Sequence, residues 1–82
     1  METVLSPKAF KNLERLNQPM RERIKAALKK LEQEPPQGDI KAMAGQEGFR
    51  LRVGGYRILF SVKNDTIVVV DIGPRGQVYK GR

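Results

Sequence analysis

Two arginines stand on opposite strands of a predicted β-hairpin, where their side chains could bind an anion. Residues 49–60 alternate apolar and basic side chains on both sides of Gly54-Gly55, a pattern typical of a hairpin with one apolar and one cationic face. A two-residue turn at these glycines places Arg52 directly opposite Arg57. Because like charges at opposed positions destabilise a sheet, we expect this pair to serve the binding of an anion and not folding.

The rest of the chain must position this hairpin, and its pattern predicts an α+β fold. We expect a short N-terminal strand, a helical hairpin and a three-stranded antiparallel meander (β-α-α-β-β-β), with the helices packed on one face of the sheet. Ser6-Pro7 predicts the start of the first helix, and Asn17 the start of the second, which ends before Pro35-Pro36. The predicted apolar faces are Phe10, Leu13 and Leu16, then Met20, Ile24, Ala27, Leu28 and Leu31.

Two other stretches are assigned no specific chemistry. The second helix has a basic face with acidic residues interspersed, which we interpret as a solvated surface. Residues 37–48 have three glycines and no clear period, so they are predicted to be a loop between the helices and the sheet. Lys41 in this loop could fold back near the hairpin.

The last strand of the meander allows two registers. A two-residue loop at Asn64-Asp65 would bury Asp71 without a partner, which is costly. We therefore predict a three-residue loop through Thr66, with Asp71 on the cationic face near Arg57. This register places Val68, Val70 and Ile72 in the core and leaves Leu59, Ile67 and Val69 on the cationic face, covered by a partner chain.

The C-terminal residues add further candidates. Residues 73–76, Gly-Pro-Arg-Gly, predict a turn that carries Arg75 away from the strand end. If the following residues fold back over the hairpin, Arg75 and Tyr79 join Arg50, Arg52 and Arg57 at one site.

Composition limits the chemistry that this site can use. The 82 residues form one small domain, and they include no cysteine and no histidine, so we predict neither a disulfide nor a metal or other cofactor. The net charge is +7, of which residues 1–48 contribute +2 and residues 49–82 contribute +5. A polyanion such as nucleic acid is the expected partner. Neither a signal peptide nor a membrane span is predicted, so the chain is expected to be soluble and cytoplasmic.

The chain resembles a known family, the RelE/ParE superfamily of type II toxins. The resemblance covers nearly the whole chain, from Ser6-Pro7 through the helices to the hairpin. Its most specific parts are Gly55-Tyr56-Arg57 and the later run Ile72-Gly73-Pro74-Arg75 with Val78-Tyr79. The superfamily contains RelE-like toxins, which cut messenger RNA in the ribosomal A site, and ParE-like toxins, which poison DNA gyrase.

The resemblance implies a set of site residues. The RelE-like branch has two basic residues on the first hairpin strand, an arginine after Gly-Tyr, a second arginine near the end and a terminal tyrosine. Arg50, Arg52, Arg57, Arg75 and Tyr79 match these positions in this chain and are the predicted catalytic residues. Arg50, Arg52, Lys41 and Lys80 are also predicted to bind RNA. This match favours RNA cleavage by attack of the 2′-hydroxyl, without a metal.

The resemblance also implies partners and leaves two alternatives. A toxin requires a cognate antitoxin, and a RelE-like toxin would act on messenger RNA in the ribosomal A site. The toxin–antitoxin complex would bind operator DNA. The alternatives are a gyrase inhibitor and a non-catalytic relic that binds antitoxin and operator. One departure bears on mechanism: the hairpin bases are lysines in the best-known RelE proteins, whereas Arg50 and Arg52 are effectively always protonated and are poor general bases.

Overall fold

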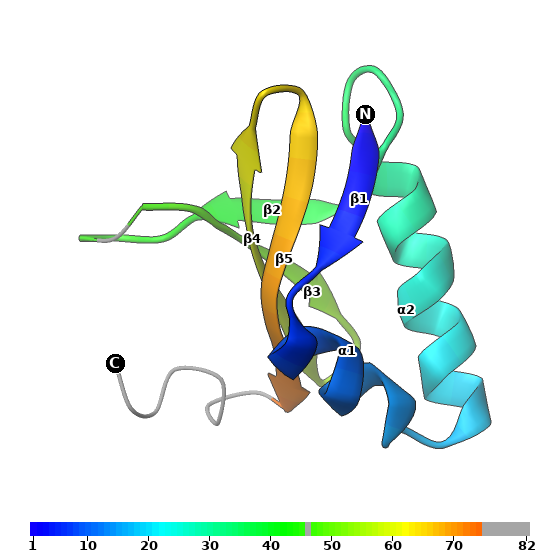
Figure 1. The fold of residues 1–82 in the computed structure, drawn as a ribbon. Coiled ribbons are helices and arrows are strands. Elements are labelled where there is room, and N and C mark those ends of the chain that lie inside the picture. Colours follow the sequence, from blue (N-terminus) through cyan, green and yellow to red (C-terminus); the bar gives the residue numbers. More distant parts are fainter. Residues whose placement is uncertain (46, 75–82) are drawn as a thin grey trace.

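The computed structural model describes residues 1–45 and 47–74, which form two helices and a five-stranded sheet (Figure 1). The α+β class and the placement of both helices on one side of the sheet are confirmed. No helix in this part of the chain is long and apolar enough to span a membrane. The elements are β1 (Glu2–Leu5), α1 (Pro7–Glu14), α2 (Gln18–Leu31), β2 (Asp39–Ala42), β3 (Phe49–Val53), β4 (Tyr56–Lys63) and β5 (Thr66–Pro74).

Both helices start at the predicted capping residues. The Ser6 hydroxyl accepts a hydrogen bond from the Ala9 amide at 3.0 Å. The Asn17 side-chain oxygen accepts one from the Met20 amide at 3.3 Å. Each cap is followed by a proline in the first turn, where the missing amide proton costs nothing. Local sequence therefore sets where the helical hairpin begins.

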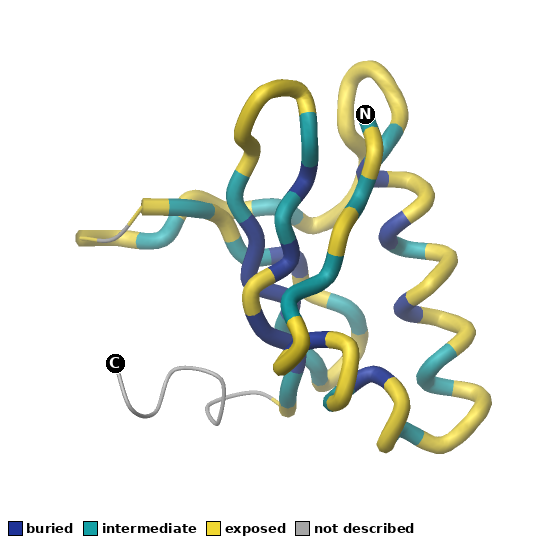
Figure 2. The backbone as a smooth tube through the Cα atoms, viewed as in Figure 1, coloured by how far each residue is buried: buried dark blue, intermediate teal, exposed yellow. Residues whose placement is uncertain are grey.

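The apolar face of α2 was predicted correctly, whereas that of α1 was partly wrong. Figure 2 shows the buried residues of α2 on the side turned toward the sheet, and they include Ile24, Leu28 and Leu31. In α1, Leu13 is buried, but Phe10 is 56% exposed and Ala9 is buried in its place. Ala9 is four residues before Leu13, which is the closer match to the helical period. Phe10 therefore lies outside the core.

The sheet has the order β1-β5-β4-β3-β2, with β1 parallel to β5 and every other pair antiparallel. Two features were not predicted. Part of the expected loop forms β2, which pairs with β3 so that Lys41 lies opposite Arg50. The first strand joins the sheet beside the last, so the sheet is mixed. The meander thus has four strands, and β1 and β2 are the edges.

The glycine hairpin has the predicted register. Val53 pairs with Tyr56 and Arg52 with Arg57, which leaves only the two glycines in the turn. Gly54 has φ +58°, in the left-handed region that favours glycine. The same turn that sets the register therefore brings the two arginines together.

The predicted register of the second hairpin was wrong. Asn64 and Asp65 have φ 50° and 62° and form a two-residue turn, so Lys63 pairs with Thr66. Further along, Phe60 pairs with Val69 and Leu59 with Asp71, which makes the residue between Val69 and Asp71 the extra residue of a β-bulge.

The bulge explains why apolar residues at both odd and even positions of β5 are buried in the core. Before it, Ile67 and Val69 are buried in the core; after it, Ile72 pairs with Ile58 and is buried as well. Val70 is the bulged residue and is 42% exposed, contrary to expectation. Leu59, Ile67 and Val69 are all buried within the chain itself. The expectation that a partner covers these three residues is therefore withdrawn.

Candidate anion-binding site

Four basic residues share the face of the sheet that is turned away from the helices. Side chains alternate along a strand, and Leu51 and Ile58 of β3 and β4 belong to the core under the helices. The positions that alternate with these core residues hold four basic side chains, which therefore lie on the opposite face. They pair across adjacent strands as Lys41 with Arg50 and Arg52 with Arg57. The structure thus brings together four of the predicted site residues.

The arginine pair, Arg52 and Arg57, carries charge that the protein does not neutralise. Arg52 is exposed and Arg57 is half-buried. The Arg57 guanidinium donates one long hydrogen bond of 3.5 Å to the carbonyl of Tyr56. Within residues 1–45 and 47–74, no carboxylate lies within ion-pair distance of either arginine. An anion could therefore bind here without displacing an internal partner.

Arg50 lies in a different environment. Only 14% of its side chain is exposed, and its Nη1 lies 3.9 Å from a carboxylate oxygen of Asp39 on β2. That nitrogen is buried and has no hydrogen-bond acceptor in the described part of the chain. Because its side chain is mostly buried, Arg50 is better suited to positioning and to the local electric field than to direct contact with a ligand.

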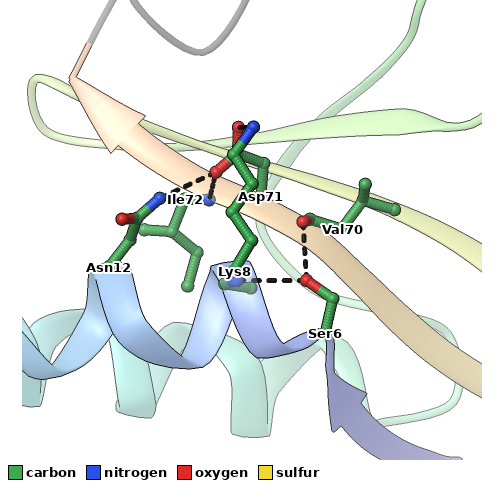
Figure 3. A network of polar contacts seen from close by, with 7 residues as sticks. Ser6, Lys8, Asn12, Val70, Asp71 and Ile72 are labelled. Carbon is green, nitrogen blue, oxygen red and sulfur yellow. Dashed lines mark hydrogen bonds and ion pairs between the residues drawn. The ribbon is translucent and has the colours of Figure 1, made fainter.

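Asp71 does not pair with the arginines, contrary to the prediction. It is 4% exposed and lies against α1 (Figure 3). One carboxylate oxygen accepts hydrogen bonds from the Asn12 side chain at 2.9 Å and from the Ile72 amide at 2.8 Å. The other lies 3.3 Å from the Lys8 ammonium. We call these groups the Asp71 cluster.

The path of the chain from β1 to α1 explains this outcome. β1 pairs with β5 only as far as Leu5 opposite Val69. The Ser6 amide then donates to the Val69 carbonyl at 2.9 Å, and the Ser6 hydroxyl donates to the Val70 carbonyl at 2.8 Å (Figure 3). Beyond this point α1 takes the place of β1 beside β5. Asp71 therefore meets side chains of α1, and its charge is unavailable to the arginines.

The remaining predicted residues, Arg75, Tyr79 and Lys80, lie outside the described residues. The last described residue, Pro74, pairs with Tyr56, next to Arg57. The sequence reading missed two other sets of residues. The alternating pattern Asp39-Ile40-Lys41-Ala42 could have predicted β2, but four residues are too few for that signal to be distinct. No local pattern could have paired Lys8 and Asn12 with Asp71.

Comparisons with known proteins agree with this fold. A family model described as the ParE toxin of type II toxin–antitoxin system, parDE, matches residues 3–79. The structure is similar to a chain of the RelB–RelE antitoxin–toxin complex from Methanococcus jannaschii, with 28% identity over 93% of this chain and 94% of that one and a TM-score of 0.77. A comparison with curated protein sequences finds no match.

Two further solved structures are similar. The archaeal RelE–RelB complex from Pyrococcus horikoshii OT3 contains a chain with 25% identity over 93% of this chain and 96% of that one, at a TM-score of 0.76. The isolated RelE toxin of E. coli has 21% identity over 95% of this chain and 89% of that one, at a TM-score of 0.75, and supports the fold alone. The resemblance drawn from the sequence is thus confirmed. The chain belongs to the ParE toxin family of type II toxin–antitoxin systems, within the RelE/ParE superfamily, and its structure is like that of RelE.

Proposed function

We propose that this toxin is an endoribonuclease that cleaves messenger RNA in the ribosomal A site and so stops translation. The observation that carries the proposal is the arginine pair, whose two side chains face each other from β3 and β4 without a neutralising carboxylate among the described residues. Each guanidinium can donate two parallel hydrogen bonds to phosphoryl oxygens, so two of them on a rigid sheet suit a phosphodiester.

In the proposed reaction the nucleophile is supplied by the RNA itself. The 2′-hydroxyl oxygen attacks the adjacent phosphorus, and the bond from phosphorus to the 5′-oxygen breaks. The products are a 2′,3′-cyclic phosphate and a 5′-hydroxyl, so the 2′-oxygen loses one proton and the 5′-oxygen gains one. Negative charge grows on the phosphoryl oxygens in the transition state, where a fixed donor such as Arg57 is worth about 3 kcal/mol.

The other predicted residues receive secondary roles in this proposal. Arg52 holds the RNA backbone next to the attacking hydroxyl, and Arg50 positions it. Arg75 shares the phosphoryl clamp with Arg57, and Tyr79 stacks on a base or orients a proton, on the strength of the sequence alone. Lys41 and Lys80 contact the RNA backbone. Because arginine remains protonated, we assign the proton acceptor to the ribosome, which also orients the message.

A toxin of this kind requires a neutralising antitoxin, and we propose that one binds a groove between α1, β1 and α2. The groove is about 360 Å³ and is lined by apolar side chains of all three elements, including Leu5, Phe10, Leu13 and Leu28. Phe10 is 56% exposed there. Glu14, Lys25, Lys29 and Glu32 surround it, so the groove fits an amphipathic antitoxin segment. Bound antitoxin would also link the toxin to operator DNA. The message and ribosome place the activity in the cytoplasm.

The family description favours a second candidate function. The matching family model is named for ParE, and the superfamily includes ParE-like toxins that poison DNA gyrase. A gyrase inhibitor does not need the arginine pair for phosphodiester chemistry. The two functions therefore differ in what the cell loses, which is intact message in one case and DNA supercoiling in the other.

The deciding experiment adds the protein to a cell-free translation system and maps the ends of the message. We expect wild-type protein to cut the message within codons and stop synthesis, and Arg57→Ala to leave the message intact. Lys63→Ala is the matched control, because it removes an exposed cation from the same strand. Intact message with wild-type protein would contradict the proposal, and loss of gyrase supercoiling in a parallel assay would establish the second candidate.

A further inference from the structure

We propose that a second cationic groove, between α2 and the hairpin end of β3, binds the backbone of single-stranded RNA beyond the cleaved phosphate. The groove is about 360 Å³, and its walls are Arg23, Ala26, Ala27 and Lys30 of α2, residues 51–54 at the hairpin, and residues 37–39. We call it the α2–β3 groove. The proposal rests on the proposed function, and it gives a role to helical charges that the sequence reading assigned to a solvated surface.

The two cations of α2 in this groove differ from their neighbours on the same helix. Arg21 donates hydrogen bonds to the carbonyls of Glu14 and Leu16, and Lys25 lies 3.8 Å from Glu22. Arg23 and Lys30 have no ion-pair partner in the part of the chain that the structure describes. The two cations of α2 that already have such partners therefore lie outside the groove, and Arg23 and Lys30 line it with their charges unpaired.

The spacing of these residues forms a trough. Arg23 and Lys30 are seven residues apart, which is about two helical turns or 10.5 Å along one helix face. Ala26 and Ala27 lie between them and line the groove with the smallest side chains that a helix favours. A chain of phosphates could lie on the alanines with a cation at each end.

Both ends of the trough are held in place. At one end the Arg23 guanidinium lies against the hairpin turn, 3.3 Å from where a Cβ on Gly54 would be, so glycine allows this close approach. At the other end the Gln37 amide donates to the Lys30 carbonyl at 3.0 Å, which fixes the chain leaving α2. The groove is therefore formed before any ligand binds.

The groove and the candidate site share one residue. Arg52 lines it and is also one member of the arginine pair. The only carboxylate among its described lining residues is Asp39, which lies 3.9 Å from Arg50 and is partly neutralised by it. A strand held at the arginine pair can thus continue past the hairpin turn to Arg23. This shared arginine favours the RNA backbone over an acidic protein segment as the occupant.

The test replaces both groove cations, as Arg23→Gln with Lys30→Gln, and measures binding in two arms. The first arm uses a fluorescent single-stranded 2′-O-methyl RNA, which cannot be cleaved, and the second uses ribosomes without message. We expect affinity for the oligonucleotide to fall roughly tenfold at low salt, because two charge-assisted contacts are lost. A loss with ribosomes alone would mean that the groove binds ribosomal RNA and would overturn the proposal. With the oligonucleotide, the salt slope should fall by about 1.4, since each phosphate contact on a single strand contributes about 0.7.

Matched controls and a parallel assay keep the outcomes separate. Lys11→Gln with Arg15→Gln removes two exposed cations of the chain outside the groove and should leave binding unchanged. Arg23→Lys with Lys30→Arg keeps the charges and should restore most of the affinity. Unchanged binding of the oligonucleotide by the groove variants would overturn the groove proposal. If wild-type protein leaves message intact while the groove variants still lose RNA affinity, the proposed function fails and the groove stands.

Discussion

Two charged clusters lie near each other on the sheet and are organised in opposite ways. Asp71 pairs with Leu59 of β4, two residues along that strand from Arg57. At the edge of β5, the Asp71 carboxylate is buried and receives two hydrogen bonds and an ammonium group. On β3 and β4, Arg52 and Arg57 face each other with no carboxylate partner among the described residues. The first cluster joins α1 to the sheet, while the second leaves its hydrogen-bond donors open.

The difference separates stability from function. Burying Asp71 is favourable only because its partners replace water, so this cluster can be read as part of the fold. The opposed arginines disfavour the sheet slightly and have no ion-pair partner among the described residues, which is the expected cost of a site prepared for an anion. Substitutions in the two clusters should therefore change different quantities.

The largest effect is expected at Arg57. Arg57→Ala should lower the rate of message cleavage by roughly 100-fold, because it removes a fixed cationic donor from the transition state. Its free energy of unfolding should stay the same or rise by a few tenths of a kcal/mol, since repulsion from Arg52 is lost. Single-turnover cleavage on programmed ribosomes and urea denaturation measure the two quantities. A large loss of stability would mean that Arg57 belongs to the fold.

The opposite result is expected at Asp71. Asp71→Ala should lower the free energy of unfolding by about 2–3 kcal/mol, because the Ile72 amide and the Asn12 amide group lose a buried acceptor. Cleavage by the fraction that remains folded should be unchanged. Urea denaturation measures the first, and cleavage below the unfolding transition measures the second. Asp71→Asn is the control, because it can keep the bond to the Ile72 amide and should cost less.

A smaller loss is expected at Ser6, which supports the Asp71 cluster from the start of α1. Its hydroxyl caps the helix and also donates to the Val70 carbonyl. Ser6→Ala should cost about 1–2 kcal/mol, and Asn17→Ala, which removes only a cap, about 1 kcal/mol. Thermal or urea unfolding of both variants checks the order. Equal losses would show that the bond from Ser6 to β5 contributes nothing.

The sequence could predict those features of the two clusters that depend on residues close together in the chain. Ser6, Asn17 and Gly54-Gly55 act through their nearest neighbours, so the caps, the hairpin register and the opposed arginines all follow from short patterns. These features were enough to position half of the candidate site.

The rest depends on contacts between distant segments. The bulge at Val70 shifts β5 by one residue, which neither regular register of the strand could represent. The burial of Asp71 depends on α1 replacing β1 beside β5, a consequence of the parallel β1–β5 pairing. β2 is too short to be distinct from a loop, yet it places Lys41 and Asp39 beside Arg50 and Arg52.

A substitution can give the arginine pair the carboxylate that it lacks. Arg57→Glu places a carboxylate opposite Arg52, and its neighbour on β5 is the uncharged Gly73, so it should raise the free energy of unfolding by about 0.5 kcal/mol, the usual worth of an opposed ion pair in a sheet. The same change should abolish cleavage, because the cationic donor is lost and the new carboxylate repels phosphate. Arg57→Gln separates lost repulsion from new attraction, and the gain of Arg57→Glu over Arg57→Gln should shrink in high salt. If Arg57→Glu is no more stable than wild type at low salt, the pair is already neutralised within the protein, and the reason for assigning it to an anion disappears.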